Sequence, residues 1–562
     1  MESFRFPLLY DMGGTCYDKR RTRIHIRWGG RSPTPCEGGF PFLKQNHRWV
    51  LGLLALLLAF ALAGCAASSG ASSSKPSSSS QTSSAKVSSQ TATKPTTFSL
   101  PVVFAQDMNP LTSGCMINVT LWPLLYDSLT QPDTTFTARQ GLAASITNSG
   151  TTMMVQLRGG VKFSDGSALT AQDVAYSYNL VKSTPSSYFY GNVGNIASVT
   201  PQGSGTVVFT LSAPDTLAQN LLDIPIIKTG SVAAARTPPV GSGPYTFSTN
   251  QFSGTLSVNK NWYGGGTFGF QTIALVNMPS SDAVLGSLKI GEINYLYTDY
   301  GNGAVPAANL DSKTVNLNRM VFMGVNSGHS LTADAHVRRA ISFALDRQSL
   351  SDDAFSAQAL PTDLPYNPDW ADGVKPASTE LRAQLDKAAT ELTAAGYTAQ
   401  NIGGVATKAG GASPLQLTLL VNSGDQQMTA AANQIKVSLA KAGIGITINA
   451  QPFAAYVAAL QAGSYDLYLG NLSLTADMDL SPLLAPGGAA AYGVPANSAT
   501  LAAFNTWRTG GALSALTTAY TSEMPFIALC FKTGSVTFTP GLSGTVNPTV
   551  QNVLYGIAGW HY

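Results

Sequence analysis

The chain has 562 residues, more than a single hydrophobic core usually organises, so we expect two or three lobes. Only 11% of the residues are charged, and the formal net charge is +3. Residues 1–64 contain 9 Lys and Arg against 4 Asp and Glu. The rest of the chain contains 24 Lys and Arg against 26 Asp and Glu, so its net charge is −2. A body this close to neutrality lacks the basic surface of a nucleic-acid-binding protein, so we expect no nucleic-acid partner.

An uncharged apolar run near the start of the chain has the layout of a signal peptide. It covers residues 49–64 (WVLGLLALLLAFALAG), follows Lys44 and Arg48, and ends directly before Cys65. It is shorter than the about 20 residues that a membrane-spanning helix prefers, which disfavours the alternative of a transmembrane anchor. Residues 62–65 (LAGC) are similar to the bacterial lipobox, whose cysteine is diacylated and becomes the new N-terminus. We therefore predict lipidation of Cys65 and an extracytoplasmic protein anchored to the cell membrane.

The segment after Cys65 has the composition of a flexible tether. Residues 66–96 are mostly Ser, Thr, Ala and Lys, so they bury too little apolar surface to repay the entropy of folding. We assign residues 65–97 to the lipidated cysteine and this linker, and residues 1–64 to the signal peptide with an upstream extension. Because the extension has no evident role, we predict that translation starts at position 43.

The cysteines give no sign of a metal site. They form no CxxC pair and have no Cys/His spacing suited to zinc, and they stand at positions Cys16, Cys36, Cys65, Cys115 and Cys530. Processing at Cys65 would leave Cys115 and Cys530 in the folded body. Export permits these two to form a disulfide, and two buried free thiols are the alternative.

The segment from 153 to 181 predicts a strand, a tight turn and a helix in succession. Apolar and polar side chains alternate over residues 153–157, as in a half-buried strand, and the dipeptide DG at 165–166 marks the turn. Thr170 then begins a helix, with Asp173 three residues later as the acidic partner of a capping box.

This segment carries a resemblance to a known family. Residues 157–183 (LRGGVKFSDGSALTAQDVAYSYNLVKS) closely resemble the signature of the family-5 extracellular solute-binding proteins, the peptide- and nickel-type substrate-binding lipoproteins of ABC importers. Further blocks resemble the family in the expected order, namely LYDSL at 125–129, PVGSGPY at 239–245, LKIGEI at 288–293 and VRRAISFALDR at 337–347. The resemblance covers nearly all of residues 98–562.

The block at 337–347 reads physically as a helix with one apolar face. Its apolar residues fall at i, i+3, i+4, i+7 and i+8 and are Val337, Ala340, Ile341, Ala344 and Leu345. We expect Arg338 and Arg347 to pair with carboxylates at a lobe boundary, and Asp346 to cap the next helical turn.

The remaining pattern alternates strands with helices, which predicts a mixed sheet covered by helices. The expected elements are strands at 98–104, 415–421, 444–448, 465–469 and 525–529, a short helix or turn at 121–129, and helices at 386–395, 427–442, 453–461 and 513–523.

The resemblance implies an α/β fold with three lobes, like that of type II periplasmic binding proteins with an extra lobe. Lobe one would comprise 98–140, 240–325 and 521–562, lobe two 141–239, and lobe three 326–520. Two connections would cross between lobes one and three, as a hinge requires.

The same resemblance implies a function in transport. The protein would capture a peptide or similar small solute by lobe closure and deliver it to ABC permease subunits in the membrane, as a monomer and without a cofactor. The alternatives are binding of a nickel chelate or an oligosaccharide by the same fold, and a non-transport role in surface signalling or assembly.

No catalytic constellation is visible, so we predict that the protein is not an enzyme. GxSxG, HExxH and GxxxxGK motifs are absent from the sequence, and the GxGxxG match at 264–269 has neither a strand before it nor a helix after it. An unrecognised secreted hydrolase is a lesser alternative. A metal-chelate site would have to use His329 and His336, which lie seven residues apart.

The resemblance also points to an anchoring residue. In peptide carriers of this family, a strand near a YD pair leads to an aspartate that pairs with the α-ammonium group of the peptide. Here YDLYLG at 465–470 matches that strand, and Asp477 is the best candidate for the anchor, with Asp479 and Asn471 beside it. The tryptophan usual in this region is missing. The competing expectation is that Asp477 and Asp479 cap a helix or face water.

Overall fold

The computed structural model describes residues 97–562, apart from 233–236, 251–252, 279–280, 300–309, 403, 409–413 and 496. The predicted signal peptide, Cys65 and most of the linker therefore lie outside the described residues. Within the described part of the chain, none of the helices has both the length and the apolar character to span a bilayer.

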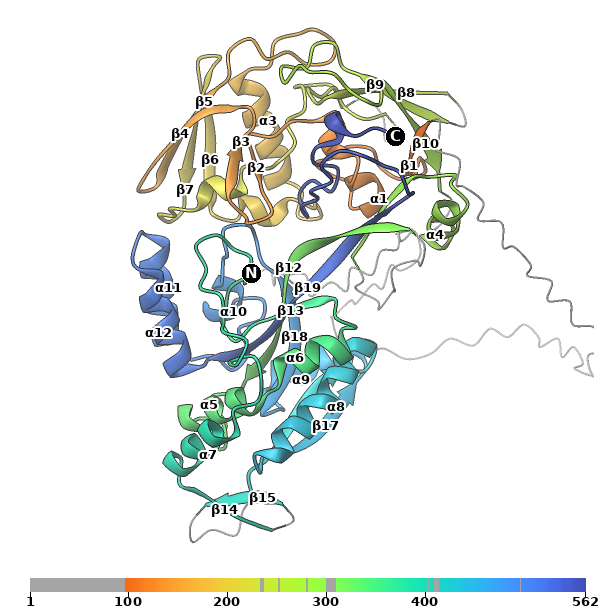
Figure 1. The fold of residues 1–562 in the computed structure, drawn as a ribbon. Helices are drawn as coiled ribbons and strands as arrows, with labels where there is room; N and C mark the ends of the chain where they lie inside the picture. Colours follow the sequence, from red (N-terminus) through yellow and green to blue (C-terminus); the bar gives the residue numbers. More distant parts are fainter. Residues whose placement is uncertain are drawn as a thin grey trace, which may run out of the picture. The chain divides into compact units, whose positions relative to one another are not determined.

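Two four-stranded sheets are formed by the first part of the described chain (Figure 1). The first has the order β1-β10-β9-β8, and only its β1–β10 pair is parallel. The second is antiparallel with the order β4-β5-β7-β6. Their strands are β1 (Phe98–Val102), β4 (Ala143–Ser149), β5 (Thr152–Leu157), β6 (Ile196–Gln202), β7 (Thr206–Leu211), β8 (Tyr245–Thr249), β9 (Gly254–Val258) and β10 (Thr272–Asn277).

The helix expected after Thr170 is α3 (Ala171–Lys182), and it packs on β6 and β7. Its capping box is confirmed, because the Thr170 backbone N–H donates to Asp173 Oδ2 at 2.9 Å. The expected turn is also present, since Gly166 N–H donates to Phe163 O and Gly166 has a φ of 86° that favours glycine.

A seven-stranded mixed sheet dominates the second part of the chain. Its order is β11-β19-β12-β18-β16-β17, with β13 paired to β19, and β16 is parallel to both neighbours. The strands are β11 (Tyr295–Thr298), β12 (Asp311–Val325), β13 (Ala359–Pro361), β16 (Gln416–Asn422), β17 (Gly445–Gln451), β18 (Leu467–Ser473) and β19 (Phe526–Phe538). The mixed sheet predicted from the alternating pattern is thus confirmed.

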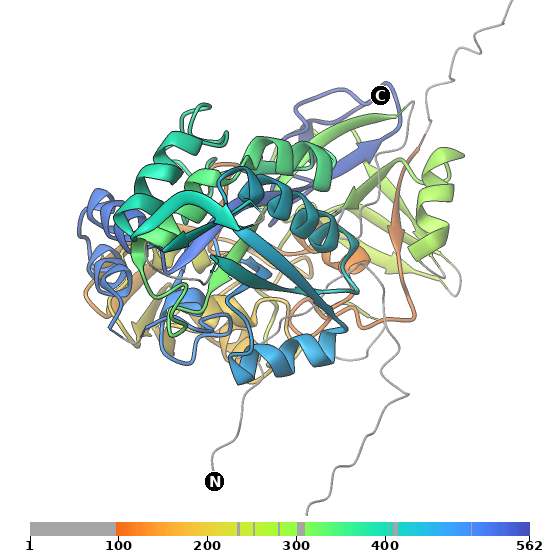
Figure 2. The same ribbon diagram turned by 90° about the horizontal axis from the view of Figure 1, so that it is seen from below.

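Two helices cover opposite faces of the parallel strands (Figure 2). They are α8 (Gln426–Lys441) and α9 (Phe453–Ala462), and both contact β16 and β17. Right-handed crossovers explain this placement, because the chain moves one way along the sheet through α8 and back the other way through α9.

The remaining elements are short hairpins and helices. The hairpins pair β2 (Thr130–Pro132) with β3 (Ala138–Gln140), and β14 (Tyr397–Ile402) with β15 (Val405–Lys408). The helices are α1 (Met116–Val119), α2 (Trp122–Leu125), α4 (Ser281–Lys289), α5 (Ala335–Ala344), α6 (Arg347–Ser349), α7 (Leu385–Ala394), α10 (Ser481–Leu484), α11 (Ala499–Arg508) and α12 (Leu513–Glu523).

Helix α5 buries the predicted apolar face, but its arginines bind differently from the prediction. Arg338 Nε donates to the carbonyl oxygens of Glu523 and Met524 at 2.9 and 3.1 Å. Arg347 Nε donates to Ala528 O at 2.9 Å. The expected pairing with carboxylates is therefore wrong. The end of α12 leaves carbonyl oxygens without helical partners, and the guanidinium of Arg338 satisfies them. Asp346 accepts from Ser349 N–H at 2.9 Å, so its predicted capping role is confirmed.

Strands β12 and β19 pass through two hydrophobic cores. In β12, Val315 and Leu317 pack in a core with the two four-stranded sheets, whereas Met320 and the residues after it pack in the core around α5 and α8. In β19, Val536 and Phe538 belong to the first of these cores, and residues 526–531 belong to the second. The predicted division into three lobes stays a prediction.

The two strands change register near the point where the cores meet. Their pairing shifts between Asn316 and Arg319, and Asn318 in between has a φ of 51°. Asn318 Nδ2 donates to Leu474 O at 3.1 Å and Thr475 O at 3.0 Å. Asparagine tolerates a positive φ better than most residues, and these bonds hold the irregular residue in place.

Candidate functional site

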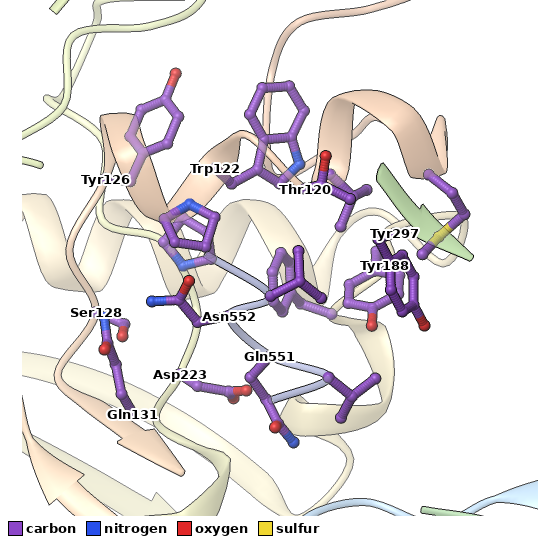
Figure 3. Close-up of a pocket in the computed structure, with 17 residues that line it drawn as sticks. Thr120, Trp122, Tyr126, Ser128, Gln131, Tyr188, Asp223, Tyr297, Gln551 and Asn552 are labelled. Carbon is purple, nitrogen blue, oxygen red and sulfur yellow. The ribbon is translucent and has the colours of Figure 1, made fainter. Parts of the chain in front are cut away.

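Five separate parts of the chain line one cavity (Figure 3). The lining residues come from 116–131, 188–189, 223–225, Tyr297 and 550–553. The cavity volume is about 40 Å³, which is room for a few water molecules. Pockets that hold small ligands begin at about 300 Å³, so the walls have to move before a solute of that size can enter.

Aromatic side chains form much of the cavity wall. Trp122 and Tyr126 pack edge to face with ring centroids 6.2 Å apart, and Tyr188 and Phe189 pack in the same way at 5.0 Å. Burial, together with the negative charge of Asp223, raises the pKa of Tyr188 to about 12. Burial likewise raises the pKa of Tyr297 well above its ordinary value. Both phenols are therefore neutral hydrogen-bonding groups at physiological pH.

Asp223 is the one acidic residue among those that line this cavity. Asn192 Nδ2 donates to its Oδ1 atom. The pKa of Asp223 is raised to about 7, mainly by burial and also by the negative charge of Asp477, against the hydrogen bond from Asn192, which lowers it. Near neutral pH this carboxyl group is poised between its protonated and ionised forms.

Two further polar atoms of lining residues are buried without a hydrogen-bond partner. They are Trp122 Nε1, a donor, and Gln551 Oε1, an acceptor. Buried polar atoms are nearly always paired in folded proteins, with protein or with water. A bound molecule could supply the missing hydrogen-bond partners of these two atoms.

A second cavity, of about 140 Å³, adjoins the first and shares Val550 and Gln551 with it. Its wall includes Thr314 and Asn316 of β12 and Thr533 of β19. Segments that pack in both hydrophobic cores therefore contribute to this second cavity.

The predicted anchor Asp477 lies in a buried ion pair. It is 1% exposed, and its Oδ2 atom accepts from Arg508 Nη2 at 2.6 Å. The other terminal nitrogen of Arg508 donates to the backbone oxygen of Asp477 at 2.6 Å. Arg508 also pairs with Asp215, which is 2% exposed. Asp477 therefore neither faces water nor lacks a cation.

Three carboxylates surround this one guanidinium. Burial raises the pKa of Asp215 to about 6, although the positive charge of Arg508 acts in the opposite direction. Asp477 and Asp479 each add negative charge around Asp215 and Arg508. The cluster thus carries more buried acid than base, and it lies within electrostatic range of Asp223.

The other two predicted ligand contacts, Asp479 and Asn471, also make bonds within the protein. Asp479 Oδ1 accepts from Ser481 N–H at 2.9 Å and Oδ2 accepts from the Ser481 hydroxyl at 2.7 Å, at the start of α10. These bonds form a local turn before α10, whose N-cap residue is Leu480. Asn471 lies in β18 opposite Val321 of β12. Like Asp477, neither residue lines the two cavities described above.

The sequence did not single out Arg508, Asp215 or Asp223. Asp215 and Arg508 are 293 positions apart, and no local pattern links them. The one available signal was Asp223 itself, a lone acid within the otherwise apolar run LLDIPII at 221–227. Burying a charge in such a segment is costly unless it has a function or a partner.

His329 and His336, the histidines of the metal-chelate alternative, each lie beside a different carboxylate. His329 Nδ1 lies 3.1 Å from Asp466, and His336 Nδ1 lies 2.7 Å from Glu391. Across the described ranges, no group of three His, Cys, Asp or Glu side chains is arranged to hold a metal ion.

The disulfide considered between Cys115 and Cys530 is absent, which corrects that expectation. Cys530 is a buried free thiol in β19, and burial raises its pKa to about 12. It belongs to the core around α5 and α8, whereas Cys115 packs with a separate small cluster around α4.

Residues 137–490 match the bacterial extracellular solute-binding proteins, family 5 Middle. The chain belongs to this family. Its members are extracytoplasmic solute-binding proteins, so the predicted family and a solute-binding role are confirmed at that level.

Curated relatives agree with this assignment. The chain is 28% identical over 369 residues to the oligopeptide-binding protein AppA of Bacillus subtilis, an alignment that covers 61% of this chain and 66% of AppA. It is 27% identical over 270 residues to protein XP55 of Streptomyces lividans, covering 44% of this chain and 48% of XP55. The chain thus spans about half to just under two thirds of the length of these relatives.

Solved structures share the fold of this chain over most of its length. The periplasmic murein tripeptide-binding protein MppA, in an unliganded open form, gives a TM-score of 0.68 at 18% identity and covers 83% of this chain and 98% of its own. NikA of Brucella suis with Fe(III)-EDTA gives 0.61 at 20% identity, covering 81% and 98%. AppA of Bacillus subtilis with a nonapeptide gives 0.53 at 23% identity, covering 83% and 97%. The predicted periplasmic-binding-protein fold is confirmed.

Proposed function

We propose that this protein is the substrate-binding lipoprotein of an ABC importer and that it captures a peptide outside the cytoplasm. The observation that carries the proposal is the aromatic cavity with buried, unpartnered hydrogen-bonding atoms, in a chain of this family. An oligopeptide-binding protein among the relatives favours a peptide over a metal chelate. The separate partners of His329 and His336 point the same way.

Capture requires the cavities to open and close. Together they leave too little space for a peptide in the described form, and the second is bordered by β12 and β19. These strands run through both cores and change register at Asn318. We assign the hinge to them, with the ligand enclosed between lobes one and three as predicted.

We keep Asp477 as the proposed contact for the α-ammonium group of the peptide. In the described form the guanidinium of Arg508 already pairs with this carboxylate. A peptide amine would share the carboxylate with Arg508 or displace it, and Asp479 would add negative charge nearby. For Asn471, a contact with the ligand stays a prediction.

The finer features of the proposal concern the membrane. Lipidation at Cys65 would hold the protein at the membrane surface, and the linker of residues 66–96 would let it reach its permease subunits. We propose a monomer that binds its solute without transforming it and without a cofactor.

Thermal-shift screening of the purified exported protein tests the function directly. The panel contains oligopeptides, oligosaccharides and nickel chelates. A ligand present at 100 times its dissociation constant stabilises the folded state by about 2.7 kcal/mol, which is a measurable shift. We expect peptides to raise the melting temperature. A panel in which only sugars or chelates do so, or in which nothing does, contradicts the proposal.

A further inference from the structure

Two side chains that line the aromatic cavity offer hydrogen-bond acceptors without a cationic partner. The carboxylate of Asp223 accepts from Asn192, and none of the ion pairs among the described residues includes Asp223. Gln551, which also lines the cavity, has a buried side-chain oxygen without a hydrogen-bond partner. Figure 3 draws both side chains among those that line the cavity. A ligand group that donates hydrogen bonds would satisfy both.

The rest of the wall suits a positive charge. Tyr188, Phe189 and Tyr297 line the cavity together with Asp223. The face of an aromatic ring attracts a cation, most strongly where water is excluded. Trp122 Nε1 is the one lining donor that is buried without a partner, and it suits a neutral acceptor such as a peptide carbonyl.

The two guanidinium groups of this region already have carboxylate partners. Arg319, whose positive charge acts on Tyr188 and Tyr297, pairs with Asp299 at 3.6 Å. Arg508 pairs with Asp215 and Asp477, and Asp479 adds a further negative charge. The charge of Asp477 acts on Asp223 in the unfavourable direction. Asp223 is therefore not paired with a cationic side chain, and a proton or a ligand cation can compensate its charge.

We propose that Asp223 selects ligands that place a cationic group in this cavity, such as the lysine or arginine side chain of a peptide. The proposal rests on the proposed peptide-binding function and names its ligand class. Ligands that would place a carboxylate here are disfavoured, because they would bring a second negative charge to the cavity. The amino-terminal contact proposed for Asp477 is separate from this one.

Matched peptides test the selection. The probes are tetra-alanine peptides in which one position at a time carries lysine, its neutral analogue norleucine, or glutamate, titrated by calorimetry into the full exported protein. At one position we expect lysine to bind at least tenfold more tightly than norleucine, and glutamate to bind most weakly. Asp223→Asn should bring lysine and norleucine within about twofold of each other. Asp223→Glu, which retains the charge, should restore most of the preference.

Asp165→Asn is the matched control, because it also removes one acid, but from an exposed pair with Lys228. It should leave the lysine preference unchanged. If lysine and norleucine bind equally at every position, or Asp223→Asn keeps the preference, the inference is wrong while peptide binding stands. If the wild type binds no peptide, the proposed function fails with it. Should Asp223→Asn not fold, the Asp223→Glu variant and the wild-type lysine-to-norleucine ratio still decide the question.

Discussion

Asp477 Oδ2 accepts a hydrogen bond from Arg508 Nη2 at 2.6 Å, in an ion pair shielded from solvent. Arg508 is the last residue of α11 and pairs with Asp215 as well. The backbone N–H of Thr216 donates to Arg508 O at 3.0 Å. One side chain thus joins the segment after β7 to the segment after β18, which the predicted lobe division assigns to lobes two and three.

Removing this arginine should be costly. Arg508→Ala leaves Asp215 and Asp477 buried without their cation, and breaking a buried pair in this way typically costs about 3–5 kcal/mol. We expect the free energy of unfolding, measured by urea denaturation, to fall by about this amount.

Arg382→Ala is the control for this prediction, because Arg382 pairs with Asp346 at 3.4 Å and its side chain is 55% exposed. Exposed pairs contribute about 1 kcal/mol or less. Equal losses of stability in the two variants would show that the Arg508 cluster has no special role.

The second prediction concerns Asp477, the proposed contact for the peptide amino group. Asp477→Asn should weaken binding of a peptide with a free amino terminus by about 2–5 kcal/mol, because it removes the charge opposite the ammonium group. The N-acetylated peptide should bind the wild type weakly and be little affected by the substitution. Calorimetry with both peptides on both proteins measures the difference. Equal binding of the two peptides by the wild type would rule out Asp477 as the anchor.

A third prediction concerns the pH dependence of stability at Asp127. This carboxyl group is 5% exposed and accepts from the Ser242 hydroxyl at 3.0 Å, and burial raises its pKa to about 7. The folded state therefore holds a proton that the unfolded state releases near pH 4, so stability falls as pH rises from about 4 to about 7. Asp127→Asn should be more stable than the wild type at pH 8 and should lose stability less steeply over this range.

Urea denaturation at pH 5 and pH 8 checks this prediction. Asp165→Asn provides the contrast, because hydrogen bonds from Lys228 and Ser167 lower the pKa of Asp165 to about 2. Its contribution disappears only as pH falls from about 4 toward 2, so that variant should keep the wild-type dependence between pH 5 and 8. If the free energy of unfolding of Asp127→Asn falls between pH 5 and pH 8 as steeply as that of the wild type, Asp127 is not the group responsible.

A fourth prediction tests the membrane anchor. Intact-mass analysis of protein extracted from membranes should give a chain that begins at Cys65 and carries a diacylglyceryl group. Cys65→Ala should leave the precursor unprocessed or release the protein from the membrane fraction. A mature protein that retains residues 49–64 would be incompatible with lipidation.

Much of the fold was predictable because its signals are local. The helix expected at 513–523 is α12 (Leu513–Glu523), and the face expected at 337–345 is buried in α5. In both cases the spacing of apolar side chains alone sets the buried face. The capping box of Thr170 and Asp173 is equally local, since its partners are three residues apart.

The candidate site was far less predictable, because its contacts join distant parts of the chain. The family resemblance led to Asp477, but nothing in the spacing of Asp215 and Arg508 indicates that they share an ion pair. Arg338 was expected to meet a carboxylate, and it binds backbone oxygens, which every residue provides and no sequence pattern marks. The cavity around Asp223 arises only when five segments meet.

The two long strands β12 and β19 have a consequence for how the protein unfolds. Each contributes side chains to both hydrophobic cores, so neither core can lose its strands without fraying the edge of the other. Local melting that begins in one core should therefore spread along the shared strands, and the two cores should unfold in one cooperative transition. Hydrogen exchange followed in urea should therefore give the same denaturation midpoint for amides in either core.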